Sequence, residues 1–244
     1  LIQMNSTSPP VNPLLQRERD ACDFNMAQFS ELMHGSREKL DHHKKVLQMI
    51  ESDPQIALSF EIHNMTRAEK IEDAYRRIHR MKAIGKYDID FQSAAYYNGM
   101  FLAALPNSIH SQMFETSVRY LGTKEQVKSW LPQILTSEIV GCYAQTELGH
   151  GSNVQGLETT ATYDKNTDEI VLHTPKTSAA KFWPGDMGLT ATHAIVYAQL
   201  IVDKKKQGVQ AFMAPIRSLS THRTFPGVEA GDIGPKFGMN TKDN

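Results

Sequence analysis

The sequence predicts an α+β protein in which an all-helical N-terminal domain is followed by an antiparallel β-barrel or β-sandwich domain. Apolar residues recur at helical spacing from Leu14 to about Leu135. After about Ser137, threonine-rich and β-branched runs alternate with turn sequences, as strands and hairpins do. Helices followed by strands, without strand–helix alternation, argue against a doubly wound fold. We therefore expect a flexible N-terminus (1–13), a helical domain (14–136) and a β domain (137–244).

Composition narrows the class of protein. The chain has 244 residues, 40% of them hydrophobic, and a formal net charge of −1, so no basic field favours nucleic acid or an anionic membrane. Cys22 and Cys142 are the only cysteines, which argues against a disulfide framework and for a reducing compartment. No apolar run approaches 18 residues, and the start lacks a signal-peptide core. We expect a soluble intracellular protein.

The helical half carries recognisable start signals. Prolines near the N-terminus exclude regular structure there. Thr66 with Glu69 and Thr123 with Gln126 match capping boxes, each followed by an apolar stripe at helical spacing. A further helix is expected from about Asn107 to Tyr120. Pro132 is expected to kink or end its helix early.

Two hairpins are predicted in the second half. ETTATYD (158–164) and EIVLHT (169–174) are joined by a KNTD turn. HAIVYAQLIVD (193–203) and VQAFMAPI (209–216) flank the KKKQG sequence at 204–208. The chain opens on LIQ before Met4 and closes on the polar sequence TKDN. We therefore expect a fragment of a longer protein.

The most informative run is CYAQTELGHGSN at 142–153, where an apolar flank leads into a glycine-rich turn. Gly149 and Gly151 allow backbone N–H groups to approach a flat or anionic ligand closely, and Ser152 adds a hydroxyl. Val154 occupies the third glycine position of a dinucleotide fingerprint, and no P-loop is present. The run is not a nucleophile elbow, so serine hydrolysis is disfavoured. The histidines lack metal-ligand spacing, and no metal is expected.

A second run, AAKFWPGD at 179–186, lies about forty residues downstream. Trp183 is open to two interpretations, an ordinary core residue or an aromatic wall beside a Pro-Gly turn. Such a wall facing a threonine and glycine amides suits a planar heteroaromatic ligand, since stacking uses the ring and donors fix its polar edge.

These two runs belong to a longer collinear set that resembles the peroxisomal acyl-CoA oxidases and covers nearly the whole chain after Val11. The other segments of the set are NPLLQRERDACDF (12–24), LMHGS, GLETTATYD (156–164), HAIVYAQLI (193–201), AFMAPIR (211–217) and GDIGPKFG (231–238). The wider acyl-CoA dehydrogenase superfamily shares the T-E-x-G-x-G-S pattern. The histidine in GHGS, the WPG turn and the IGPK segment favour the oxidase branch.

The resemblance implies FAD as cofactor and assigns roles by motif position. Thr146 would meet the pyrimidine edge of the flavin, Gly185 would contact the cofactor from the WPG turn, and Trp183 would line the flavin region. Ser152 would contact the pantetheine arm of acyl-CoA. Phe182 departs from the tryptophan common at its position. Glu147 is expected to be a structural residue of the turn and not the proton acceptor.

The implied reaction converts acyl-CoA to trans-2-enoyl-CoA and reduces O2 to hydrogen peroxide, the first step of peroxisomal fatty-acid β-oxidation. The resemblance places the catalytic glutamate beyond Asn244, so no catalytic residue is expected within this chain. It also implies truncation before the C-terminal helical domains, an isolated fragment with little activity, and a homodimer or related heterodimer at full length. Two alternatives remain: an acyl-CoA dehydrogenase using an electron-transfer flavoprotein, and a non-catalytic acyl-CoA- or flavin-binding module. Acyl chain-length preference is not predicted.

Overall fold

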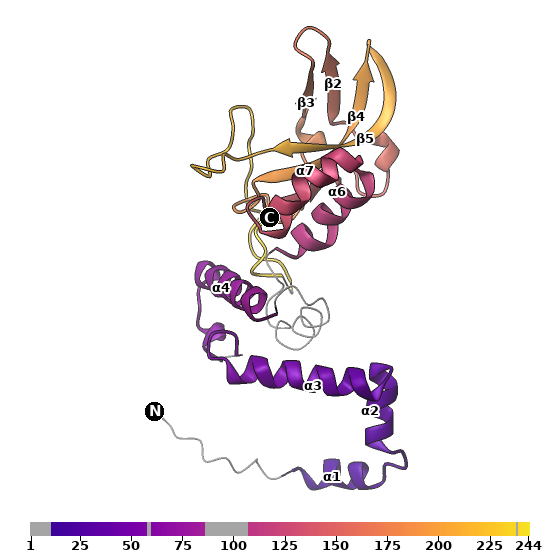
Figure 1. Cartoon of the computed structure of the whole chain (residues 1–244), viewed down its shortest axis with the longest axis vertical. Helices are drawn as coiled ribbons and strands as arrows, with labels where there is room; N and C mark the ends of the chain where they lie inside the picture. The colour runs from indigo at the N-terminus through magenta and orange to yellow at the C-terminus, as the bar shows by residue number, and fades with distance from the viewer. Residues whose placement is uncertain (1–10, 58–59, 86–106, 238) are drawn as a thin grey trace. The chain divides into compact units, whose positions relative to one another are not determined.

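The computed structural model describes residues 11–57, 60–85, 107–237 and 239–244 (Figure 1). The chain divides into two compact units, Leu1–Met49 and Ile50–Asn244. The first contains α1 (Pro13–Asp20), α2 (Met26–His34) and most of α3 (Arg37–Ser52). Asn12 and Asn25 cap α1 and α2 through their side chains, and Gly35 ends α2 in the left-handed conformation. No described helix is long and apolar enough to cross a membrane.

The second unit begins with helices whose starts match the sequence prediction. Its helices are α4 (Arg67–Gly85), a π-helical turn (His110–Phe114), α6 (Glu115–Leu121) and α7 (Lys124–Leu135). Both capping boxes form: the Glu69 carboxylate accepts from the Thr66 N–H, and Thr123 and Gln126 exchange hydrogen bonds. Pro132 lies inside α7, which continues to Leu135. The expected early end was wrong because a proline so close to the C-terminus removes little of the helical ladder.

The strands form one mixed sheet centred on β4. They are β1 (Gly141–Ala144), β2 (Thr160–Asp164), β3 (Glu169–His173), β4 (His193–Val202) and β5 (Lys205–Pro215). β5 pairs antiparallel along the length of β4, while β1 and β2 pair parallel to the two halves of its other edge. The helices and this sheet confirm the α+β class. The sheet is open and mixed, so the expectation of a purely antiparallel barrel or sandwich needs correction.

Both predicted hairpins are present. β2 pairs antiparallel with β3, from Thr160 opposite His173 to Asp164 opposite Glu169. The β4–β5 turn is tighter than expected, because β5 already begins at Lys205. Asp203 and Lys204 both have positive φ (52° and 61°), which matches a two-residue primed turn. Lys205 and Lys206 therefore open a strand and Lys204 lies in the turn, instead of all three forming a five-residue loop.

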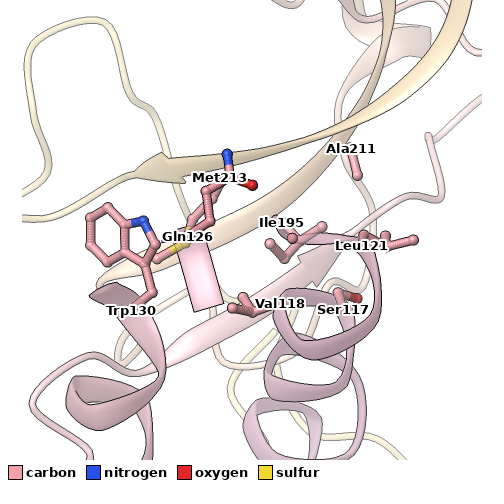
Figure 2. Close-up of a pocket in the computed structure, with 9 residues that line it drawn as sticks. Ser117, Val118, Leu121, Gln126, Trp130, Ile195, Ala211 and Met213 are labelled. Atoms are coloured by element: carbon pink, nitrogen blue, oxygen red, sulfur yellow. The ribbon is translucent and has the colours of Figure 1, made fainter. Parts of the chain in front are cut away.

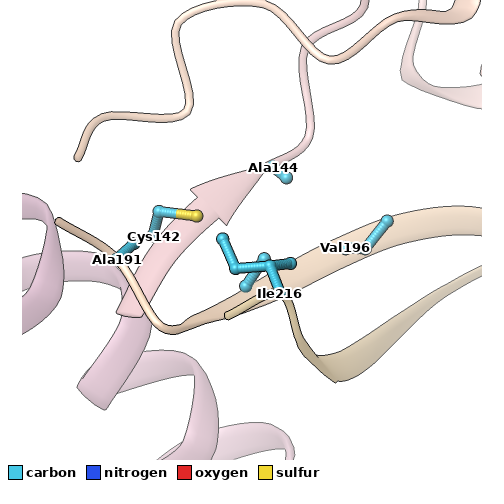
Figure 3. Packing of buried hydrophobic residues seen from close by; sticks show 6 residues of the cluster. Cys142, Ala144, Ala191, Val196 and Ile216 are labelled. Carbon is cyan, nitrogen blue, oxygen red and sulfur yellow. The ribbon is translucent and has the colours of Figure 1, made fainter. Parts of the chain in front are cut away.

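Alternate residues of β1 pack on opposite faces of the sheet. Cys142 and Ala144 join a buried cluster with Ala191, Val196 and Ile216 (Figure 3). Tyr143 faces the other cluster, whose buried members are Phe114, Val118, Ile134, Ile139 and Ile195. That second cluster holds α6 and α7 against the sheet. Gly141 packs directly on this cluster, because an added Cβ would lie 2.1 Å from the Phe114 ring. The short β1 strand is thus fixed from both sides, and so is the point where the glycine-rich turn begins.

Candidate functional site

The structure brings the two informative sequence runs side by side. Beyond β1, the backbone at 143–149 runs antiparallel to the backbone at 178–184, and we call these stretches the paired segments. Their backbone hydrogen bonds run from Tyr143 N to Pro184 O (3.1 Å), from Phe182 N to Thr146 O (2.9 Å), from Leu148 N to Ala180 O (2.8 Å) and from Gly149 N to Ser178 O (2.8 Å). The residues predicted to share a ligand therefore come from adjacent stretches of backbone.

Glu147 is the buried anchor of the glycine-rich turn and is 2% exposed. Its carboxylate accepts hydrogen bonds from the N–H groups of Glu158 (2.7 Å) and Thr159 (2.8 Å), from the Thr159 hydroxyl (2.6 Å) and from Lys181 Nζ (3.1 Å). Burial alone would raise the pKa of Glu147, but these hydrogen bonds outweigh it and lower the pKa. The carboxylate is ionised and fully engaged, which confirms its structural role.

Lys181 is a site residue that sequence reasoning missed. Its ammonium group donates to the carbonyls of Gln145 (3.1 Å) and Tyr197 (2.7 Å) as well as to Glu147. Burial lowers its pKa, and the bonds to Glu147 oppose that effect. One cation thus ties the glycine-rich turn to β4. The available signal was a lysine within an otherwise apolar and aromatic run, a position where an ion needs a buried partner.

Thr146 lies at the centre of the paired segments and is half-buried. Its carbonyl accepts the Phe182 N–H. Among the residues that the structure describes, neither its N–H nor its hydroxyl forms a hydrogen bond. Two donors at one position are thus available to a ligand.

Trp183 is 64% exposed and its neighbour Phe182 is 37% exposed. The two rings stack with centroids 6.2 Å apart and an interplanar angle of 29°. Within the described part of the chain Trp183 is not a core residue, since most of its surface faces solvent. The pair forms an exposed aromatic surface directly after the backbone contact with Thr146.

The turn at 183–186 has an unusual backbone. Trp183, Gly185 and Asp186 all have positive φ, at 47°, 72° and 64°. Gly185 is buried, and a Cβ added to it would lie 2.6 Å from Ile109 Cγ1. Two features therefore require glycine at this position: the left-handed backbone conformation and the close approach of Ile109.

Ser152 lies apart from these residues. It is exposed at the tip of the glycine-rich turn, where its carbonyl accepts the Val154 N–H. Within the described part of the chain, its hydroxyl forms no hydrogen bond. The backbone hydrogen bonds therefore bring together Thr146, Trp183 and the turn that contains Gly185, and they do not extend to Ser152.

A separate cavity of about 100 Å³ lies between α6, α7 and the strands β4 and β5 (Figure 2). Its walls are mostly apolar, with Val118 and Leu121 from α6, Trp130 from α7, and Ile195 and Met213 from the sheet. It lies on the face of the sheet that α6 and α7 cover. The described residues form no group of three histidine, cysteine or acidic side chains able to hold a metal ion.

Comparison with known proteins identifies the first part of the chain. The family model described as acyl-coenzyme A oxidase N-terminal matches residues 25–140. The match covers just under half of the chain. Human peroxisomal acyl-coenzyme A oxidase 1 is 39% identical over 240 residues, which are 96% of this chain and 36% of the human protein. The chain thus spans little more than a third of the length of this relative.

Solved structures of acyl-CoA oxidases share the fold. Acyl-CoA oxidase 1 from Arabidopsis thaliana superposes with a TM-score of 0.86 at 36% identity, over 94% of this chain and 36% of that protein. Acyl-CoA oxidase-2 from Caenorhabditis elegans was solved bound with FAD, ascaroside-CoA and ATP. It superposes with a TM-score of 0.87 at 34% identity, over 98% of this chain and 37% of that protein. Both matches extend well beyond residue 140, so the likeness includes the sheet and the paired segments.

Proposed function

We propose that the protein acts as an FAD-dependent acyl-CoA oxidase. The reaction converts acyl-CoA to trans-2-enoyl-CoA with O2 reduced to hydrogen peroxide, as the first step of peroxisomal fatty-acid β-oxidation. The observation that carries the proposal is the pairing of segments 143–149 and 178–184. It bonds Thr146, which has two free donors, to Phe182, the residue before the exposed Trp183. The family match and the oxidase relatives support it.

The donors and the aromatic surface fit a flavin. An isoalloxazine is flat, so the exposed ring of Trp183 matches its face, and its pyrimidine edge carries acceptors that suit the N–H and hydroxyl of Thr146. When bound, FAD supplies the hydride acceptor for the β-hydrogen of the substrate. Donors held at that edge favour negative charge there because they are oriented before the reaction begins. We include Gly185 in the site because the turn that presents Trp183 needs its conformation.

Ser152 is the proposed contact for the pantetheine arm of acyl-CoA. Its hydroxyl is exposed and has no hydrogen-bond partner among the described residues, as a group that meets a ligand from solvent requires. Its place at the tip of the glycine-rich turn separates it from Thr146. That separation suits a long substrate whose thioester and pantetheine arm are read at different points.

The base that removes the α-proton is proposed to come from outside the described residues. Glu147 receives four hydrogen bonds and is ionised. Glu158 is engaged by Lys176 Nζ (2.7 Å) and Ser178 Oγ (2.5 Å), and Asp186 is fully buried. Each of these carboxylates is buried or already engaged by other groups, whereas proton abstraction needs an available carboxylate beside the substrate carbon.

Assembly and location follow the oxidase relatives in this proposal. We propose a homodimer or a related heterodimer for the full-length protein, with acyl-CoA and O2 as its reactants. Peroxisomal location is proposed from the names of relatives such as the human and Arabidopsis proteins. No nucleic-acid or membrane partner is proposed.

The test compares the 244-residue polypeptide with the product of the complete open reading frame. Each is purified, its flavin content is read from absorbance near 450 nm, and peroxide release from palmitoyl-CoA is measured in air. We expect the complete product to be yellow and to release peroxide. The 244-residue polypeptide is expected to retain FAD weakly and to show little oxidase activity.

Four results would contradict the proposal in different ways. A complete product without flavin would remove the cofactor assignment. Flavin reduction by acyl-CoA that continues only with an electron-transfer flavoprotein would indicate a dehydrogenase. Binding of FAD or acyl-CoA without any electron transfer would indicate a non-catalytic module. Peroxide release by the 244-residue polypeptide at the rate of the complete product would place the base within this chain.

A further inference from the structure

The turn at 183–186 cannot hold its shape through its own residues. Trp183 and Asp186 are non-glycine residues in the left-handed region, at φ 47° and 64°. Such conformations persist only where the surroundings impose them. Both carboxylate oxygens of Asp186 are buried without a hydrogen bond, and the ion pair of this carboxylate is with Lys242 Nζ (3.9 Å), outside the turn. Something outside the turn must therefore fix it.

On the upstream side, the support is the paired segments, through the bond from Tyr143 N to Pro184 O. On the downstream side, the support comes from residues 240–244, which we call the 240–244 clamp. The side chains of Thr241, Lys242, Asp243 and Asn244 are all buried, at 1–8% exposed. This burial is unexpected for a sequence as polar as TKDN, so hydrogen bonds must compensate for it.

Asp243 makes the contacts that fix the turn. Its carbonyl accepts the Asp186 N–H (2.8 Å). Its carboxylate accepts the N–H groups of Leu189 and Thr190 (2.9 Å to Thr190) and the Thr190 hydroxyl (3.3 Å). Thr190 closes the loop by donating its N–H (3.1 Å) and its hydroxyl (3.3 Å) to the Asp186 carbonyl. One residue, 57 positions from Asp186 in the sequence, thus satisfies the backbone on the downstream side of the turn.

The clamp also reaches the residues beneath Gly185. Lys242 Nζ donates to Ser108 Oγ (2.7 Å), next to the Ile109 side chain on which Gly185 packs. The Arg67 guanidinium holds the clamp from α4 through the carbonyls of Asn240 and Lys242 (3.1 Å each). Both the turn and the surface beneath it are therefore tied to the same five residues.

We propose that Asp243 is a positioning residue for the FAD site. Its carbonyl accepts the Asp186 N–H, and its carboxylate fixes the residues after the turn that bond back to the Asp186 carbonyl. Together these contacts hold the left-handed turn that presents Trp183. The inference rests on the proposed function, because it names what positions that site. It needs the acceptor geometry of Asp243 and not its charge. Asparagine at this position keeps an acceptor for the two N–H groups and can donate to the Thr190 hydroxyl, whereas alanine keeps neither.

The test uses the full-length protein with Asp243→Ala and Asp243→Asn. Hydrogen exchange of the 186–191 amides reports the turn, and the FAD dissociation constant reports the site. For Asp243→Ala we expect exchange of the Leu189 and Thr190 amides to rise at least tenfold and FAD affinity to fall at least tenfold. Asp243→Asn should restore both to within about threefold of wild type. Thr190→Val removes one hydroxyl and should give a smaller change in both.

Exchange and FAD affinity that stay at wild-type values in Asp243→Ala would overturn the inference. An Asp243→Asn variant as weak as Asp243→Ala would also overturn it, since charge and not geometry would then be needed. If Asp243→Ala loses its helical circular dichroism, the exchange and FAD affinity of Asp243→Asn and Thr190→Val test the inference instead. A wild-type protein that binds no FAD contradicts the proposed function alone, because the exchange measurement still tests whether Asp243 holds the turn.

Discussion

The two turns of the candidate site are fixed in different ways. The glycine-rich turn is held by ionised side chains on either side of it, since Glu147 binds the backbone 11 and 12 residues downstream and Lys181 spans the paired segments. The turn at 183–186 is held by the paired segments on its upstream side and by the 240–244 clamp on its downstream side. The first turn is fixed by side-chain partners up to 36 residues away in the sequence, whereas the second also needs a residue 57 positions away. The second turn should therefore respond to substitutions in a more distant part of the chain.

The largest effect is expected for Gly185→Val in the turn at 183–186. The new side chain would require a left-handed valine and would overlap Ile109, which lies 2.6 Å from an added Cβ. We expect a loss of about 2–4 kcal/mol in the local stability of the turn and loss of flavin absorbance. Helical circular dichroism should be retained.

Gly231→Val is the matched control, because a Cβ at Gly231 meets nothing within 4 Å and its φ is not positive. It should stay yellow with an unchanged melting temperature. A normal holoenzyme from Gly185→Val would show that the turn is not part of the cofactor site.

Glu147→Gln tests the glycine-rich turn. Loss of the charged acceptor should cost about 2 kcal/mol at neutral pH. The folded-state pKa of Glu147 is lowered, so its stabilisation is present above the ordinary pKa of 4.5 and is lost as pH falls below it. Urea unfolding of wild type and variant should therefore differ at pH 7 and converge at low pH. A difference that stays constant with pH would mean that the carboxylate charge contributes nothing.

Trp183→Gly separates backbone strain from ligand contact. Glycine relieves the positive φ of 47° but increases the entropy of the unfolded chain, so stability should change by less than about 1 kcal/mol. FAD affinity should fall because the exposed ring is gone. Trp183→Phe keeps a ring and should retain most of the affinity. Equal affinity in all three proteins would remove Trp183 from the site.

Ala211→Val is a reference substitution in a region that belongs to neither turn. Ala211 lines the cavity under α6 and α7, and the added methyl groups should fill part of its 100 Å³. We expect thermal stability to rise by at most about 1 kcal/mol, with FAD affinity unchanged. A fall in FAD affinity would show that the cavity and the paired segments are coupled.

Much of the fold could be predicted from the sequence because its signals are local. Capping boxes at Thr66 and Thr123 and two hairpins depend on residues a few positions apart, and all of them formed. The parallel pairing of β1 with β4 could not be predicted, since it joins Gly141 to His193 and no short pattern records that register.

In the candidate site too, the features with a local sequence signal could be predicted and the others could not. The glycine-rich run and the aromatic run each have a local signature, which is why their pairing could be predicted before any coordinates. Asp243 lacks one, because a buried aspartate is recognisable only from the N–H groups that the fold brings to it. Lys181 stands out in its apolar run, but the sequence does not show which acceptors it binds. The positive φ of Trp183 could not be predicted either, since no sequence pattern indicates that a tryptophan adopts the left-handed backbone conformation.

The central place of β4 has a consequence during synthesis on the ribosome. β1 and β5 pair only with β4 within the described sheet, and β2 pairs with it as well as with β3. A ribosome needs several seconds to pass from the end of β1 to the end of β4. Through that interval the apolar face of β1 and the helices that cover it have no sheet to join, and a nascent chain in that state is a natural client for chaperones.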